Sequence, residues 1–82
     1  MLLQEIKDQL PNASPADVVN FTIEFERNLQ KLCEFHVEYV HFYDEYASDI
    51  NYLRATRQPE NRNELEYFVD TVIGIGERLK NN

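Results

Sequence analysis

The sequence predicts an all-α fold, and three observations lead to that prediction. Only two glycines and three prolines occur in 82 residues, so long stretches run without a residue that interrupts a helix. Apolar residues recur at alternating steps of three and four, which is the spacing of one helix face. The prolines, Pro11, Pro15 and Pro59, divide the chain into three segments. We therefore expect one domain over residues 1–82, with helices at about 2–10, 15–55 and 63–79.

The first segment is predicted to be a short helix. Leu3, Ile6 and Leu10 stand at helical spacing. The helix should stop before Pro11, because a residue that precedes proline is pushed out of the α region.

The second segment opens with the strongest local signal in the chain. Ser14 is suited to cap a helix, Pro15 fits the first helical position with its fixed φ, and Asp17 can return a capping-box contact. No glycine or proline follows until Pro59. The segment therefore predicts one long central helix over residues 15–55.

The apolar face of this central helix is broad. Its seam follows steps of three and four, as in coiled-coil-like packing, and consists of Val18, Thr22, Phe25, Leu29, Leu32, His36, Tyr39, Tyr43, Tyr46, Ile50 and Leu53. Further apolar residues widen it: Val19, Phe21, Ile23, Cys33, Phe35, Val37, Val40, Phe42 and Ala47. A polar stripe opposite predicts one solvated edge: Asn20, Glu24, Arg27, Lys31, Glu34, Glu38, His41, Glu45 and Ser48.

The third segment predicts a helix that begins near Asn63, a suitable cap, with Glu64 in the first turn, where the helix dipole favours anions. Its predicted buried face consists of Leu65, Phe68, Val69, Val72, Ile75 or Gly76, and Leu79. Gly74 and Gly76 each cost about 1 kcal/mol of helix propensity relative to alanine. These two glycines are expected either to fray the end of the helix or to let another helix approach closely.

The predicted central helix is too long for its own domain. It would extend about 60 Å at 1.5 Å per residue, whereas a compact domain of this size has a diameter of roughly 30 Å. Three arrangements resolve the conflict. The short helices fold back along the long one in antiparallel fashion, the long helix breaks near residues 47–49, or a second chain covers the excess apolar face. The first combined with the third is the favoured arrangement, which predicts a helical hairpin or three-helix bundle that self-associates.

Charge and composition narrow the classes of function. The net charge of −7 comes from 15 acidic and 8 basic residues, so the chain repels phosphate backbones and anionic lipids. No run approaches the roughly 18 apolar residues of a membrane helix. The single cysteine, Cys33, allows no internal disulfide, and the first residues lack a signal-peptide pattern. We expect a soluble, cytoplasmic protein that binds neither nucleic acid directly nor membranes.

Motifs of catalysis or metal binding find weak support. Glu38 and His41 have the Glu-x-x-His spacing of di-iron bundles, but no second such motif occurs and periodicity puts them on the solvated edge. His36 is either a pH-responsive switch or a core histidine bonded to a tyrosine hydroxyl. Cys33 is expected to be a small buried hydrophobe. Without a serine elbow, phosphate loop or zinc spacing, neither an enzyme nor a cofactor is predicted.

The middle of the chain is the predicted contact surface. From 34 to 49 there are five acidic residues and no lysine or arginine, interleaved with aromatic residues. Aromatic residues dominate binding hot spots, and acidic surroundings steer a basic partner. The candidate contact residues are Phe35, Glu38, Phe42, Tyr43, Glu45, Tyr46, Asp49 and Tyr52.

These residues predict a small, non-enzymatic protein that regulates others by binding them, with a protein partner that has a basic surface. The alternative is an inhibitor that mimics nucleic acid and places its carboxylates where an enzyme binds phosphates. A third hypothesis, a metal-binding helical bundle, depends wholly on Glu38 and His41.

Overall fold

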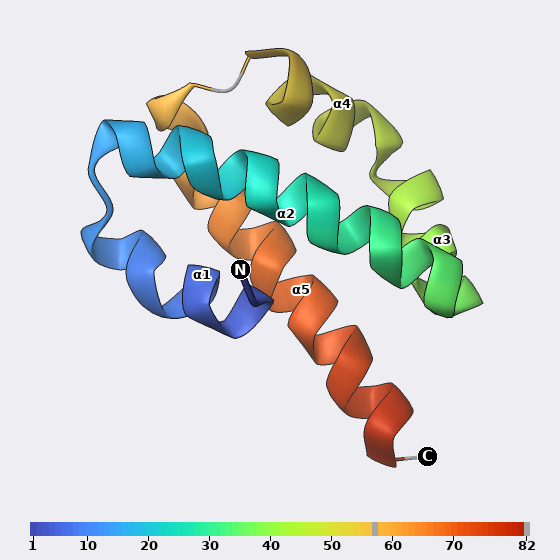
Figure 1. Cartoon of the computed structure of the whole chain (residues 1–82). Coiled ribbons are helices and arrows are strands. Elements are labelled where there is room, and N and C mark those ends of the chain that lie inside the picture. Colours follow the sequence, from blue (N-terminus) through green and yellow to red (C-terminus); the bar gives the residue numbers. More distant parts are fainter. Residues whose placement is uncertain (57, 82) are drawn as a thin grey trace.

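The fold is all-α, as predicted. A computed structural model describes residues 1–56 and 58–81, and in this part of the chain it contains five α-helices and no strand. Their bounds are α1 (Leu3–Gln9), α2 (Pro15–Phe35), α3 (Val37–Glu45), α4 (Ala47–Thr56) and α5 (Arg62–Asn81) (Figure 1). Two 3-10 helices, η1 (Leu10–Asn12) and η2 (Pro59–Asn61), precede α2 and α5. None of the helices in the described residues is long and apolar enough to cross a membrane.

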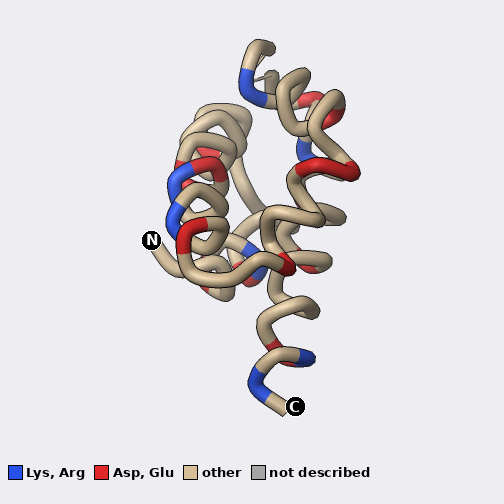
Figure 2. The backbone as a smooth tube through the Cα atoms, turned by 90° about the vertical axis from the view of Figure 1, so that its right-hand side faces the viewer, with Lys and Arg blue, Asp and Glu red and all other residues tan. Residues whose placement is uncertain are grey.

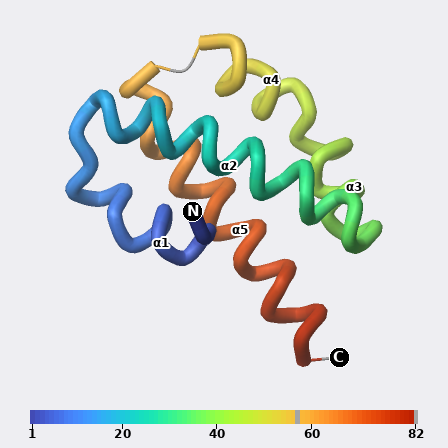
Figure 3. Tube along the Cα trace, in the orientation of Figure 1, coloured from blue at the N-terminus to red at the C-terminus, as the bar shows by residue number. Residues whose placement is uncertain are grey.

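Helices α2 and α5 cross at the centre of the molecule, and the other helices pack around them. Helix α1 packs against both α2 and α5, α3 also contacts both, and α4 lies against α2. The N-terminus lies against α2, where the Met1 ammonium is 3.2 Å from the Glu24 carboxylate. The last turns of α5 project beyond the other helices (Figure 3). The radius of gyration is 12.1 Å and the longest dimension is 37 Å. A continuous helix over residues 15–55 would not fit within this length.

The prediction of one helix over residues 15–55 is wrong, because the chain breaks twice within it. The first break is at His36, whose backbone is extended (φ −152°, ψ 140°). Its N–H donates to the carbonyl of Leu32 (3.0 Å) and closes α2. Its imidazole Nδ1 accepts from the N–H of Glu38 (3.1 Å) and caps α3. His36 is thus a half-buried helix cap and not a core histidine bonded to a tyrosine hydroxyl, whereas the pH-responsive switch stays a prediction.

Low helix propensity explains why the chain bends here without glycine or proline. Residues 35–43 are almost all aromatic, β-branched or histidine, and such side chains lose rotamer freedom against the preceding turn of a helix. The bend turns α3 across α2 and α5 and buries Tyr39 and Phe42, which are 5% and 4% exposed. Burial of these two rings offsets the lost helical hydrogen bonds.

The second break, at Tyr46 (φ −110°, ψ 21°), lies next to the 47–49 region named as one of the three possible arrangements. Its N–H still bonds the carbonyl of Phe42, and its own carbonyl accepts from the N–H of Ile50, so the axis changes direction with little loss of hydrogen bonding. The ring of Tyr46 packs against Phe42 (centroids 5.2 Å apart) and Phe68 (5.5 Å). Tertiary packing with α5 therefore fixes this bend.

The core largely follows the predicted apolar seam despite the two breaks. Its buried side chains from the seam are Val18, Thr22, Phe25, Leu29, Tyr39, Ile50 and Leu53. Helix α5 contributes Leu65, Phe68, Val69, Val72 and Ile75, and the N-terminal segment contributes Ile6 and Leu10. Phe68 is the centre of an aromatic cluster with Phe25, Phe42, Tyr46 and Tyr67. The breaks let one chain cover most of an apolar face that a straight helix would leave open, and self-association stays a prediction.

Details at the helix ends match the sequence in part. The predicted capping box is present, since the N–H of Asp17 donates to Ser14 Oγ (3.2 Å). Helix α5 begins at Arg62, so Asn63 is not its cap. Instead the buried Asn61 donates to the hydroxyl of Thr56 (2.8 Å) and ties α4 to the start of α5. A Cβ at Gly76 would lie 3.1 Å from the hydroxyl of Tyr39, so this glycine permits the close approach of α3.

Candidate interaction surface on α2, α3 and α4

The predicted contact residues separate into exposed and buried groups. Phe35 is 80% exposed and Tyr52 is 55% exposed. The carboxylates of Glu38, Glu45 and Asp49 are also exposed. These five residues remain available to a partner.

The prediction that Phe42 contacts a partner is wrong. Its ring is 4% exposed and packs edge-on against Phe68 (centroids 5.9 Å apart). Tyr43 and Tyr46 are half-buried, and Tyr46 belongs to the same aromatic cluster. A hydrogen bond with Tyr67 and nearby negative charges raise the pKa of the Tyr46 hydroxyl. The two half-buried tyrosines support the fold with one edge and reach the surface with the other.

The surface formed by α3 and the first turns of α4 is acidic. Between Lys31 and Arg54 the chain has no lysine or arginine and five carboxylates, of which one is on α2, three are on α3 and one is on α4. Figure 2 colours the acidic positions red along the backbone. One cation approaches from another element. Arg78 of α5 lines two shallow recesses that both include Glu38, and one of them also includes Glu45. Arg78 therefore offsets the negative charge on the α5 side of the surface, whereas neither of these recesses includes Asp44 or Asp49.

The structure does not bring all three predicted carboxylates together. Glu38 and Glu45 border the recess against α5, whereas Asp49 lies on α4 beyond the break at Tyr46. His41 Nδ1 is 3.7 Å from the Glu38 carboxylate, on an exposed edge. Among residues 1–56 and 58–81 no group of three or more histidine, cysteine and carboxylate side chains is placed to hold a metal ion.

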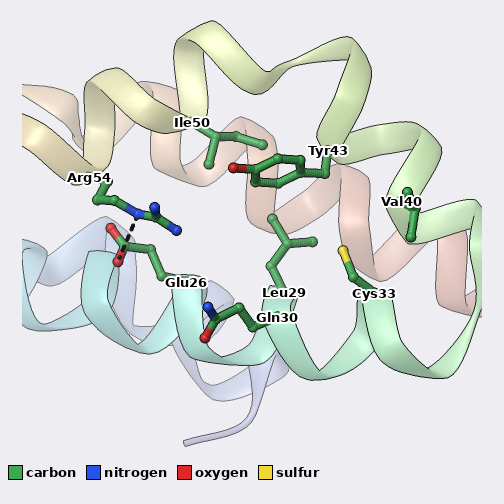
Figure 4. Close-up of a pocket in the computed structure, with 8 residues that line it drawn as sticks. All are labelled: Glu26, Leu29, Gln30, Cys33, Val40, Tyr43, Ile50 and Arg54. Carbon is green, nitrogen blue, oxygen red and sulfur yellow. Dashed lines mark ion pairs between the residues drawn. The ribbon is translucent and has the colours of Figure 1, made fainter.

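A groove opens where α3 and α4 lean over α2. Its volume is about 260 Å³, and its lining residues are Glu26, Leu29, Gln30, Cys33, Val40, Tyr43, Ile50 and Arg54. Figure 4 shows the ring of Tyr43 across the middle, with its hydroxyl directed toward the Arg54 end and the Cys33 sulfur pointing into the space below the ring. The polar side chains gather at one end and apolar ones line the rest. We call this feature the α2–α4 groove.

An ion pair closes the polar end of the α2–α4 groove. Arg54 Nε of α4 lies 3.8 Å from Glu26 Oε2 of α2 (Figure 4). The arginine side chain is 45% exposed and the glutamate 15%. Because the N–O distance is long and the arginine is nearly half exposed, this ion pair stabilises the fold by only about 0–1 kcal/mol. The two side chains can therefore rearrange when a ligand binds.

The apolar end of the groove contains Cys33. Burial raises the pKa of the Cys33 thiol, and the nearby charge of Asp44 raises it further. Both effects disfavour the thiolate, which is the nucleophilic form. Cys33 therefore serves as an apolar wall of the groove, with a carboxylate close by.

The sequence reasoning missed Val37 as an exposed residue, and it missed the groove. Val37 is 56% exposed and follows the break at His36, beside the exposed Phe35. It stands three residues before Val40, on the same side of α3, so apolar surface continues from the groove to the corner between α2 and α3. The corner could have been predicted from the residues of low helix propensity that cluster around His36. The groove had no local signal, because it depends on the angle between α2 and α4.

Comparison with known proteins adds no family to this description. No family model matches the chain, and no curated protein or solved structure matches it. What the surface can bind is argued from its own residues: exposed aromatic side chains, a stretch rich in carboxylates and the α2–α4 groove.

Proposed function

We propose that this chain is a small, non-enzymatic regulatory protein that binds another protein through the surface of α2, α3 and α4. The observation that carries the proposal is the exposure of Phe35 (80%) at the end of α2 and of Tyr52 (55%) on α4, together with a stretch of five acids between Lys31 and Arg54 that contains no lysine or arginine. Isolated exposed apolar residues are normal, but large aromatic residues exposed along a strongly acidic stretch favour contact with a basic partner.

The charge of the surface indicates the kind of partner. With a net charge of −7 the chain attracts basic surfaces and speeds encounter with them. Carboxylates at the rim contribute to rate and specificity, and aromatic anchors contribute most of the affinity. We therefore propose a protein partner with a basic surface, in the cytoplasm, where a lone thiol such as Cys33 stays reduced.

Affinity capture with charge-matched variants tests this function. The surface variant carries Glu38→Gln, Glu45→Gln and Asp49→Asn. The control carries Asp8→Asn, Glu60→Gln and Glu77→Gln, three exposed acids outside the surface. Both variants lose three negative charges. We expect the wild type and the control to capture the same proteins, and the surface variant to lose them.

Equal capture by both variants would contradict the proposal, as would the absence of any specific capture by a folded monomer. The alternative of nucleic-acid mimicry makes a different prediction in the same assay. There, duplex DNA competes with the chain for the captured protein, whereas a partner bound through aromatic anchors is not released by DNA.

A further inference from the structure

We infer that the α2–α4 groove is an anchoring site for an apolar side chain from a basic, amphipathic segment of a partner protein. This inference deepens the proposed function and rests on it, because it names the site within the surface and the chemistry of the segment bound. Its first support is the lining of the groove, in which the buried Leu29 and Ile50 form the floor and the half-buried Val40, Cys33 and Tyr43 form walls that reach solvent.

The size of the groove favours a side chain over a larger ligand. Its volume is about 260 Å³. Pockets for drug-sized molecules usually measure about 300–1,000 Å³, whereas an apolar cavity of about 150 Å³ already holds a benzene molecule. The groove thus has room for one or two apolar side chains, as expected of a hot-spot pocket that receives an anchor residue.

The charges around the groove favour cations next to that anchor. Asp44 lies near enough to Cys33 to raise the pKa of its thiol, and Glu34 precedes the exposed Phe35 at the same corner. The one cation of the lining, Arg54, is already paired with Glu26. Lysine or arginine side chains flanking the anchor would therefore meet carboxylates at the apolar end. An acidic segment would meet repulsion there.

The apolar surface beyond the groove indicates a segment longer than one residue. Val37 is 56% exposed and lies three residues before Val40. Phe35 is 80% exposed and lies two residues after Cys33. An amphipathic helix presents apolar residues at steps of three and four, so a second apolar residue can cover this corner while the first fills the groove. Exposed Lys31 lies on the other side of α2, in a recess with residues of α1 and the N-terminus.

A matched pair of valine variants tests the groove. Val40→Phe places a ring in the groove, while Val19→Phe makes the same change at a half-buried valine of α2, outside both the lining and the corner at Val37. The probe is a short synthetic helix of leucine and lysine, with two comparison peptides: one in which glutamate replaces lysine, and one in which glutamine replaces leucine. Fluorescence anisotropy gives affinity, and the alkylation rate of Cys33, the single cysteine, reports occupancy of the groove.

We expect the leucine–lysine peptide to slow Cys33 alkylation and to bind Val19→Phe as tightly as wild type. Binding to Val40→Phe should be at least tenfold weaker, and neither comparison peptide should protect Cys33. If Val40→Phe does not fold by circular dichroism, Cys33→Leu fills the same end of the groove and is measured by anisotropy.

Three results would overturn the inference. The first is equal affinity for the two valine variants, and the second is equal protection by the peptide without leucine. The third is protection of Cys33 by self-association without any peptide, which would assign the groove to a second copy of the chain. Failure here leaves the proposed function testable by itself. If the triple surface variant loses its captured proteins while Val40→Phe keeps them, the surface binds but the groove is not the anchor.

Discussion

At the scale of single residues, the local environment decides what each side chain near the groove can do. Cys33 has no disulfide partner, but it is not a reactive nucleophile, because burial and the negative charge of Asp44 both favour its neutral thiol. His36 has a structural role because its Nδ1 accepts the N–H of Glu38. Gly74 and Gly76 belong to the same helix, yet only Gly76 faces a neighbouring side chain within 4 Å.

Cys33 should titrate above the ordinary value of 9.0, because burial and the Asp44 charge penalise the thiolate. Because the pKa of the thiol is raised in the folded state, the neutral thiol stabilises the fold below pH 9. This contribution to the free energy of unfolding is lost as the pH rises through the folded-state pKa. The alkylation rate against pH should therefore have its midpoint above 9.0, and a lower midpoint in urea. Asp44→Asn should lower the folded-state midpoint, and Asp49→Asn should not. A folded-state midpoint at or below the urea value would contradict this account.

The two glycines of α5 should respond differently to alanine. At Gly74 a Cβ meets no atom within 4 Å, so Gly74→Ala should raise the free energy of unfolding by about 1 kcal/mol. At Gly76 the new Cβ lies 3.1 Å from the Tyr39 hydroxyl, so Gly76→Ala should gain less. Urea unfolding measures both. Equal gains would mean that Tyr39 does not pack against Gly76.

At the scale of helices, the sequence predicts the apolar faces better than the points at which helices end. The face of α2 could be predicted because steps of three and four identify Val18, Phe25 and Leu29 as core residues. The start of α2 was equally clear, since Ser14 and Asp17 form a local capping box.

The break at His36 was harder to predict, because it contains neither glycine nor proline. Its cause is a balance between poor helix propensity and the burial of Tyr39 and Phe42 against α5, which is a tertiary effect. The same reason explains the error at Phe42. Its partner Phe68 is 26 residues away in the chain, so periodicity alone cannot show the contact. Tyr52 and Phe42 were both predicted as contact residues because they lie away from the seam, and of these two only Tyr52 is exposed.

The cap at His36 should make a measurable contribution to stability. His36→Ala removes the acceptor of the Glu38 N–H, and loss of an N-cap acceptor typically costs about 0.5–2 kcal/mol. His36→Asn keeps an acceptor and should stay closer to wild type, because asparagine is a favoured N-cap. Urea unfolding of both variants measures the difference. If His36→Ala were as stable as His36→Asn, packing alone would set the bend.

At the scale of the whole molecule, one aromatic cluster joins the helices that form the candidate surface. Phe68 of α5 contacts Phe25 of α2, Phe42 of α3 and Tyr46 at the second break. The cluster thus holds α3 at the angle that leaves the groove open on its other side. An 82-residue domain buries only about 60–65% of its unfolded surface, so each such contact matters for stability.

Phe68→Ala should be the most destabilising of the variants considered. The ring is 1% exposed, and removing a buried phenylalanine typically costs about 3–5 kcal/mol, a large part of the stability of a small domain. Tyr67→Ala, its neighbour in sequence and 55% exposed, should cost about 1 kcal/mol. Thermal unfolding compares the two. Similar losses for both would show that Phe68 is not the centre of the core.

If this chain binds a protein through α2, α3 and α4, as we propose, amide hydrogen exchange of the complex will locate the contact on these helices. The chain is measured alone and in complex with a protein captured by the wild type. New protection is expected around residues 29–33, 37–44 and 49–54, with α1 unchanged. Protection confined to α1 and the C-terminal half of α5, with none around the α2–α4 groove, would contradict the claim.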